Sequence, residues 1–132
     1  MQIRVYYEDT DAGGVVYYAN YLKYFERGRT EYFRERGLEV ASYAAAGTLF
    51  VVAHAELDYR LAARYNDLLE MESAIVDFSR ASLTFSHLIR LHDTDRVVAE
   101  GWIRLVCVDG QFKPKRLPEE IVQIVTKLSE CE

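Results

Sequence analysis

The hydrophobic and polar positions of the chain repeat first with a helical period and later with a strand period. Over residues 18–36, apolar and aromatic residues recur every three or four positions, which predicts one long amphipathic helix. The stripe expected to face a core consists of Tyr18, Tyr21, Leu22, Phe25, Tyr32 and Phe33, with Gly28 and Arg29 on the same side. Because a glycine inside a helix is unfavourable, Gly28 in this stripe indicates close backbone packing.

Strand-like segments lie on both sides of this helix. Residues 2–7 form a short run rich in β-branched and aromatic side chains. Over residues 49–61 the odd positions are apolar and polar residues stand between them, so this strand should have one solvated face. Further strands, separated by turn signals, are predicted over residues 68–78, 83–91 and 96–108.

Two shorter helices are expected over residues 39–46 and 118–128. An antiparallel sheet joined by short turns must cover one of its faces, and only the helix over residues 18–36 is large enough to do so. We therefore expect an α+β fold in one domain over residues 1–132, with an antiparallel sheet wrapped around one central helix.

Composition narrows the class of protein. Sixteen basic and twenty-one acidic residues give a net charge of −5, which argues against general nucleic-acid binding. Half of the residues are apolar, so a disordered chain is not expected. The two cysteines, Cys107 and Cys131, match neither a disulfide framework nor a metal-ligand spacing. With no signal-like start and no apolar run as long as a membrane span, a cytoplasmic protein is predicted.

The candidate chemistry lies just before the long helix, in the stretch DTDAGGVVYY at residues 9–18. Gly13 and Gly14 allow a tight turn that would bring Asp11 close to free backbone amides at the start of the helix. A carboxylate beside such an anion-stabilising helix end suggests acyl-transfer chemistry. The alternative is an acid that only caps the helix.

The three histidines do not indicate a metal site. His54 falls on the polar face of its strand, His87 on the apolar side of its strand, and His92 in a turn. Their spacing is not that of metal ligands, and each is expected to be a surface or core residue. No metal is predicted.

A longer motif gives the chain a family resemblance. The stretch YEDTDAGGVVYYANYLKYFERGRTE, with FVV near Phe50, LVCVD at residues 105–109 and KPKRLP at residues 113–118, resembles the hotdog-fold 4-hydroxybenzoyl-CoA thioesterase family. The branch it resembles most is that of acyl-CoA thioesterases associated with the bacterial Tol–Pal system. The resemblance implies five antiparallel strands around one helix and hydrolysis of acyl-CoA to free acid and coenzyme A. It implies no cofactor, because coenzyme A is part of the substrate.

The same resemblance implies residue roles in the loop. Asp11 matches the family's catalytic carboxylate, acting either as a nucleophile or as a general base. Tyr18 matches the position whose backbone amide polarises the thioester carbonyl, and Gly14 matches the glycine that lets the loop approach the substrate. Several members of the Tol–Pal-associated branch carry histidine where this chain has Tyr18, whereas the aryl-thioester branch has tyrosine there. This departure leaves the acyl preference open.

Substrate contacts are expected at other positions. The family places coenzyme A phosphates at a turn between two strands, which here carries Arg80 and Ser82. A second basic cluster is formed by Lys113, Lys115 and Arg116. For the acyl pocket, Tyr17, Tyr21 and Phe50 are the candidates, and ordinary core packing is the alternative.

The resemblance also implies a homo-oligomer and an acyl-thioester substrate, and two other functions remain to be compared with thioester hydrolysis. A long exposed edge strand predicts a homodimer or a homotetramer. The thiol carrier is expected to be coenzyme A, with acyl-carrier protein as the alternative. A non-catalytic acyl-thioester binding module and a hotdog dehydratase remain competing functions, although a dehydratase uses a histidine in the loop and this loop has none.

Overall fold

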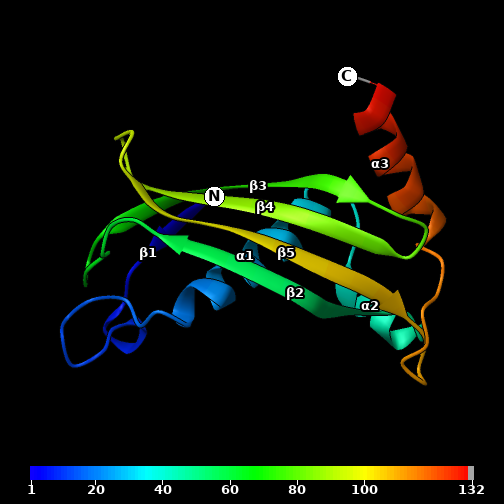
Figure 1. Ribbon diagram of the computed structural model, residues 1–132, viewed down its shortest axis with the longest axis horizontal. Coiled ribbons are helices and arrows are strands. Elements are labelled where there is room, and N and C mark those ends of the chain that lie inside the picture. The colour runs from blue at the N-terminus through cyan, green and yellow to red at the C-terminus, as the bar shows by residue number, and fades with distance from the viewer. Residues whose placement is uncertain (131–132) are drawn as a thin grey trace.

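Five antiparallel strands form one sheet in the order β1-β3-β4-β5-β2, and the long helix α1 lies against one face of it (Figure 1). The computed structural model describes residues 1–130, so Cys131 lies outside the described part. The strands are β1 (Gln2–Arg4), β2 (Leu49–Tyr59), β3 (Leu68–Phe78), β4 (Ser82–Leu91) and β5 (Val97–Val108). The helices are α1 (Asn20–Arg34), α2 (Val40–Ala45) and α3 (Glu119–Glu130), with a 3₁₀ turn over Tyr7–Asp9. The predicted α+β class is confirmed.

The first part of the chain differs from the prediction. β1 ends at Arg4 rather than at residue 7, because the chain turns there into the 3₁₀ segment. Helix α1 begins at Asn20 rather than at residue 18. Tyr18 and Leu22 were expected in the buried stripe and are 64% and 40% exposed, whereas Tyr24, which the stripe omitted, is fully buried.

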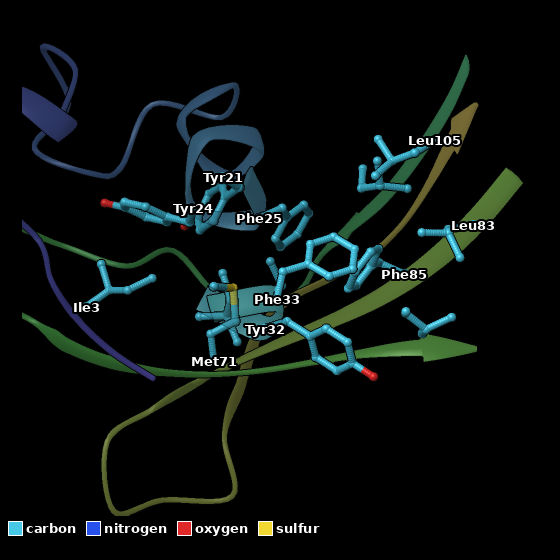
Figure 2. Close-up of a cluster of buried hydrophobic side chains, with 14 of the residues drawn as sticks. Ile3, Tyr21, Tyr24, Phe25, Tyr32, Phe33, Met71, Leu83, Phe85 and Leu105 are labelled. Atoms are coloured by element: carbon cyan, nitrogen blue, oxygen red, sulfur yellow. The ribbon is translucent and has the colours of Figure 1, made fainter. Parts of the chain in front are cut away.

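Aromatic side chains of α1 fill the core between the helix and the sheet. Phe25 and Phe33 point from the helix toward the strands (Figure 2), where Phe33 meets Phe85 and Phe25 stacks on His87. A methyl group added at Gly28 would lie 2.5 Å from Ser73 Oγ, which leaves no room for any larger residue. The close helix–sheet packing predicted at Gly28 is confirmed.

β2 forms one edge of the sheet and changes register halfway along. Its pairing with β5 shifts between Val52 and His54, which is the signature of a β-bulge. Before the shift Phe50 faces α1, with its ring 6.3 Å from that of Phe33. After the shift Tyr59 does so, with its ring 5.6 Å from that of Tyr21. The odd positions predicted to form one face over residues 49–61 are therefore correct only beyond the bulge.

No helix within residues 1–130 is both long and apolar enough to cross a membrane.

Candidate active site

The loop before α1 is a small closed turn with Asp11 at its first position. The Asp11 amide donates to the Val15 carbonyl at 2.9 Å, and the Gly14 amide donates to the Asp11 carbonyl at 3.0 Å. Gly14 has φ +79°, a left-handed conformation that glycine adopts without steric cost. The double glycine thus makes the turn as predicted, and it presents Asp11 at the surface.

The two acids of the loop have opposite environments. Asp9 is buried, and its carboxylate accepts hydrogen bonds from the Tyr6 amide at 2.9 Å and from the Asn20 side chain at 3.0 Å. Asp11 is exposed, and its Oδ1 accepts one hydrogen bond, from the Gly13 amide at 2.8 Å. Its other oxygen has no partner among the described residues. Asp9 therefore ties the loop to α1, and Asp11 carries the available carboxylate.

Asp11 does not cap the helix. It stands nine positions before Asn20, the first residue of α1, and the N-cap position is held by Ala19. Because alanine has no side-chain acceptor, no side chain caps α1; the Asn20 and Leu22 amides donate instead to the Tyr17 and Ala19 carbonyls at 2.8 and 3.2 Å. The capping alternative considered for Asp11 is therefore wrong.

The Tyr18 amide stands at this uncapped end. Within residues 1–130 it donates to no acceptor, whereas the preceding amide of Tyr17 donates to the Asp9 carbonyl at 2.9 Å. The Tyr59 hydroxyl, from the end of β2, donates to the Tyr18 carbonyl at 2.9 Å and so fixes the conformation of the residue. Tyr59 is not among the predicted site residues, because its place in an alternating strand indicates only a core-facing side chain.

Tyrosines surround the loop. A hollow of about 300 Å³ lies beside it and is lined by Val16, Tyr18, Tyr21, Tyr59, Arg60, Leu61 and Ala62. Tyr17 lies outside this hollow, with its ring 4.8 Å from that of Tyr18. The pKa of the Tyr17 phenol is raised, chiefly by its hydrogen bond with Tyr18 and to a lesser degree by the charge of Asp11, so the phenol stays neutral beside the carboxylate. Tyr17 and Tyr21 thus both lie beside the loop, and their predicted contact with the acyl group stays a prediction.

Phe50 is not brought to the loop. It lies at the opposite end of β2 and lines a separate cavity of about 250 Å³. The apolar walls of this cavity are Phe33, Val40, Phe50, Val52 and Leu105, and its polar side consists of Glu26, Arg29 and Thr30. Within one chain, Phe50 and Tyr21 therefore line different spaces.

The β3–β4 turn and the segment after β5, which carry the residues expected to bind phosphate, lie at the end of the sheet far from the loop before α1 (Figure 1). Arg80 follows β3 and borders an apolar hollow of about 450 Å³ that Arg116 also lines. Ser82 begins β4, and its hydroxyl lies 2.6 Å from that of Ser79. Since β2 has 11 residues, the two ends of the sheet are about 35 Å apart.

The two lysines after β5 lie at this same end. Lys113 is exposed, and its backbone amide donates to Asp109 Oδ1 at 3.1 Å. Its ammonium group forms no ion pair with the described residues. Lys115 Nζ donates to the buried Thr48 hydroxyl at 2.7 Å, just before β2. Lys115 therefore helps to hold the loop, and Lys113 is the more available cation.

The histidines take the positions expected of surface and core residues. His54 is exposed and pairs with Glu56 at 2.8 Å, whereas His87 is buried. His92 lies between Glu70, at 2.5 Å, and Asp93, at 3.1 Å. Glu70, His92 and Asp93 have ligand-type atoms within 4.8 Å of one another, but both ring nitrogens of His92 already contact a carboxylate. The absence of a metal stays a prediction.

Comparisons with known proteins cover nearly all of these residues. A family model described as the thioesterase-like superfamily matches residues 5–125. The acyl-CoA thioester hydrolase YbgC of Escherichia coli O6:H1 is 40% identical over 121 residues, which are 91% of this chain and 90% of that protein.

Two solved structures extend the comparison to three dimensions. A probable thioesterase from Bartonella henselae is 33% identical with a TM-score of 0.82, over 89% of this chain and 97% of that one. A DHNA-CoA thioesterase from Staphylococcus aureus is 23% identical with a TM-score of 0.91, over 100% of this chain and 93% of that one. At that identity the second likeness concerns the fold alone.

Proposed function

The chain belongs to the thioesterase-like superfamily and is an acyl-CoA thioesterase of the hotdog fold, and on this premise we propose that Asp11 and the Tyr18 amide carry its chemistry. The family predicted from the loop motif is thereby confirmed. One observation supports the proposed roles: a free carboxylate oxygen on the Gly13–Gly14 turn accompanies an unpaired amide at the uncapped start of α1.

The Tyr18 amide would bind the thioester oxygen. As the carbonyl carbon is attacked, negative charge develops on that oxygen, and an oriented backbone N–H at a helix start stabilises it. Tyr59 holds the Tyr18 carbonyl and Asp9 holds the Tyr17 amide, so the peptide between them is oriented before substrate binds. Gly14, without a side chain, would leave room for the substrate at the turn.

Asp11 would supply the attacking group by one of two routes. As a nucleophile, its carboxylate oxygen forms a bond to the thioester carbon and expels the coenzyme A thiolate, which leaves a mixed anhydride that water hydrolyses. As a general base, it removes a proton from a water molecule that attacks the same carbon. The single hydrogen bond from Gly13 leaves one oxygen available for either route.

The positions of the remaining predicted residues support a dimer. Asp11 and the basic residues lie at opposite ends of one sheet, about 35 Å apart. β2 is an edge strand, and its middle, around His54, is exposed. Antiparallel pairing of two β2 strands around that point would reverse one copy and place its basic end beside the Asp11 loop of the other. We propose that Arg80, Ser82, Lys113 and Lys115 bind coenzyme A phosphates in this arrangement. Assembly to tetramers, a role for acyl-carrier protein and a cytoplasmic location stay predictions.

The acyl group would enter the space that the dimer closes between the two hollows. Tyr17 and Tyr21 lie at the loop, and Phe50 lies at the far end of β2. Reversal of one copy would bring the Phe50 end of that copy beside the tyrosines of the other. All three predicted acyl contacts would then surround one thioester.

Thiol release from a panel of short, aryl and long-chain acyl-CoA substrates tests the role of Asp11. We expect Asp11→Asn to lower kcat about 10²- to 10⁴-fold, the range typical of a lost catalytic acid or base. Asp95→Asn, which changes an exposed acid in the β4–β5 turn, serves as the matched control and should match wild type. Equal release by wild type and Asp11→Asn across the panel would exclude Asp11 from catalysis.

A trapping experiment separates the two routes. Borohydride reduces an aspartyl mixed anhydride to the homoserine side chain, so mass spectrometry of a quenched reaction should find that change at position 11 only if Asp11 is the nucleophile.

A further inference from the structure

Arg29 of α1 lies partly buried in the cavity beside Phe50 and has no partner there. Its Nη1 is shielded from solvent and meets no acceptor within residues 1–130. Glu26, one turn earlier, also lines the cavity, but it accepts the Thr30 hydroxyl at 2.9 Å and forms no ion pair with Arg29. By contrast Arg34, on the exposed side of the same helix, pairs with both Glu31 and Glu39. Arg29 is thus a cation without a counter-charge in contact.

The surroundings of Arg29 make this arrangement unfavourable unless an anion arrives. Phe33, Phe50, Val52 and Leu105 contribute apolar walls. Burial lowers the pKa of the Arg29 guanidinium by disfavouring its charged form, and the charge of the nearby Glu26 offsets this only in part. Hydrogen bonds to such a group are stronger here than in water, because the local dielectric constant is low. A bound carboxylate would satisfy the guanidinium with two parallel N–H···O bonds.

His87 cannot play that part. Its Nε2 is also buried without a partner within residues 1–130. Burial, and to a lesser degree the charge of Arg29, lowers the pKa of His87, so the ring beside Arg29 is neutral. His87 Nε2 forms no hydrogen bond with Arg29 in the described chain, and a neutral imidazole supplies no negative charge. The Nη1 group of Arg29 therefore keeps its need for an acceptor.

The cavity lies where the far end of an acyl group would reach. It opens at the Phe50 end of β2, which the proposed pairing sets beside the tyrosine hollow of the second copy. We propose that Arg29 is a specificity residue that binds a carboxylate at the far end of the acyl group, so that ω-carboxyacyl-CoA thioesters are the preferred substrates. This inference rests on the proposed thioesterase site and dimer.

Substrates of equal length with and without the carboxylate test the inference. Glutaryl-CoA and pentanoyl-CoA are compared for wild type, Arg29→Gln and Arg34→Gln by thiol release. Wild type should favour glutaryl-CoA, and Arg29→Gln should lower kcat/KM for glutaryl-CoA about 10- to 100-fold, as the loss of charge-assisted hydrogen bonds predicts. Pentanoyl-CoA hydrolysis should stay within about 3-fold of wild type, since it lacks the group that Arg29 binds. Arg34→Gln removes one charge from the same helix and should change neither substrate.

Two results would overturn the inference. One is a wild-type enzyme that hydrolyses glutaryl-CoA no better than pentanoyl-CoA, and this comparison decides the matter even if Arg29→Gln does not fold. The other is an equal loss for both substrates in Arg29→Gln, which would make Arg29 a core residue. Failure of the proposed function looks different, because then neither substrate would release thiol in an Asp11-dependent way.

Discussion

At the scale of single residues, the loop gives two acids with one sequence position between them different surroundings. Asp9 accepts hydrogen bonds from a backbone amide and from the Asn20 side chain, so its carboxylate is used within the fold. Asp11 accepts only the Gly13 amide within residues 1–130 and is exposed at the surface. Hydrogen bonds that reach across to α1 decide this difference, and the motif alone did not contain them. The family resemblance supplied the same assignment.

The Tyr59 hydroxyl gives this loop a testable support. Tyr59→Phe removes the hydrogen bond to the Tyr18 carbonyl, and we expect kcat to fall about 2- to 10-fold, the equivalent of one ordinary hydrogen bond. KM of Tyr59→Phe should stay nearly constant, because the aromatic ring still lines the hollow.

Tyr18→Phe should keep most activity, since it retains the backbone amide.

Steady-state kinetics of the two variants, with Tyr65→Phe as an exposed control, provide the measurement. A loss of two or more orders of magnitude in Tyr18→Phe would show that the hydroxyl, rather than the amide, takes part.

At the scale of elements, α1 packs on the sheet over a buried polar pair. The His87 ring stacks on Phe25 at 4.7 Å and on Phe85 at 5.7 Å, and its Nδ1 lies 2.7 Å from Ser73 Oγ. Gly28 passes directly above this pair. Burial, aided by the positive charge of Arg29, lowers the pKa of His87 to about 3. The ring is therefore held neutral between helix and strands.

This neutral ring makes stability depend on pH. In the unfolded chain the imidazole takes up a proton below its ordinary pKa of 6.5, whereas the folded protein resists protonation down to about pH 3. The group has no effect on stability above about pH 6.5, and below it the free energy of unfolding falls by up to about 1.4 kcal/mol per pH unit. In His87→Gln, the part of this decrease in unfolding free energy that His87 causes should be absent between about pH 6.5 and pH 4.5.

Urea unfolding at several pH values measures the difference between wild type and His87→Gln. His54→Gln, which changes an exposed histidine paired with Glu56, is the control. Its free energy of unfolding should change with pH as that of wild type does. Identical slopes for wild type and His87→Gln would mean that the buried ring does not titrate as described.

Sequence periodicity predicted most elements of this fold because most of its information is local. The strand over residues 68–78 agrees at both ends with β3. The errors lie where distant contacts override periodicity. Tyr18 continues the helical stripe in sequence, but in the structure it lies before α1 with its carbonyl held by Tyr59, 41 positions away. The bulge after Val52 likewise reverses which residues face the core, and no local signal marks it. Arg29 was assigned to the buried stripe without any sign that it lacks a partner.

At the scale of the whole molecule, the edge strand β2 has one side that is not paired with another strand of the sheet. Val52 on this strand is 55% exposed, although it faces the same side as Phe50. An exposed apolar strand at a sheet edge invites pairing with a second copy. The separation of Asp11 from the basic residues is consistent with such pairing.

Val52→Glu should weaken the proposed dimer by placing a charge at this edge. Val76→Glu is the matched control, because Val76 is 56% exposed on β3, away from β2. We expect light scattering to detect monomers for Val52→Glu at concentrations where wild type and Val76→Glu are dimeric, with loss of activity in parallel. A stable, active wild-type monomer would refute both the dimer and the shared site.

The placement of Asp11 and the basic residues at opposite ends of one sheet has a genetic consequence. If each site takes its carboxylate from one chain and its cations from the other, then a chain lacking Asp11 and a chain lacking the basic end are defective in different halves. When the two are co-expressed, every mixed dimer combines one intact pair of halves with one doubly damaged pair. Two inactive alleles of this protein would therefore complement each other within a single cell.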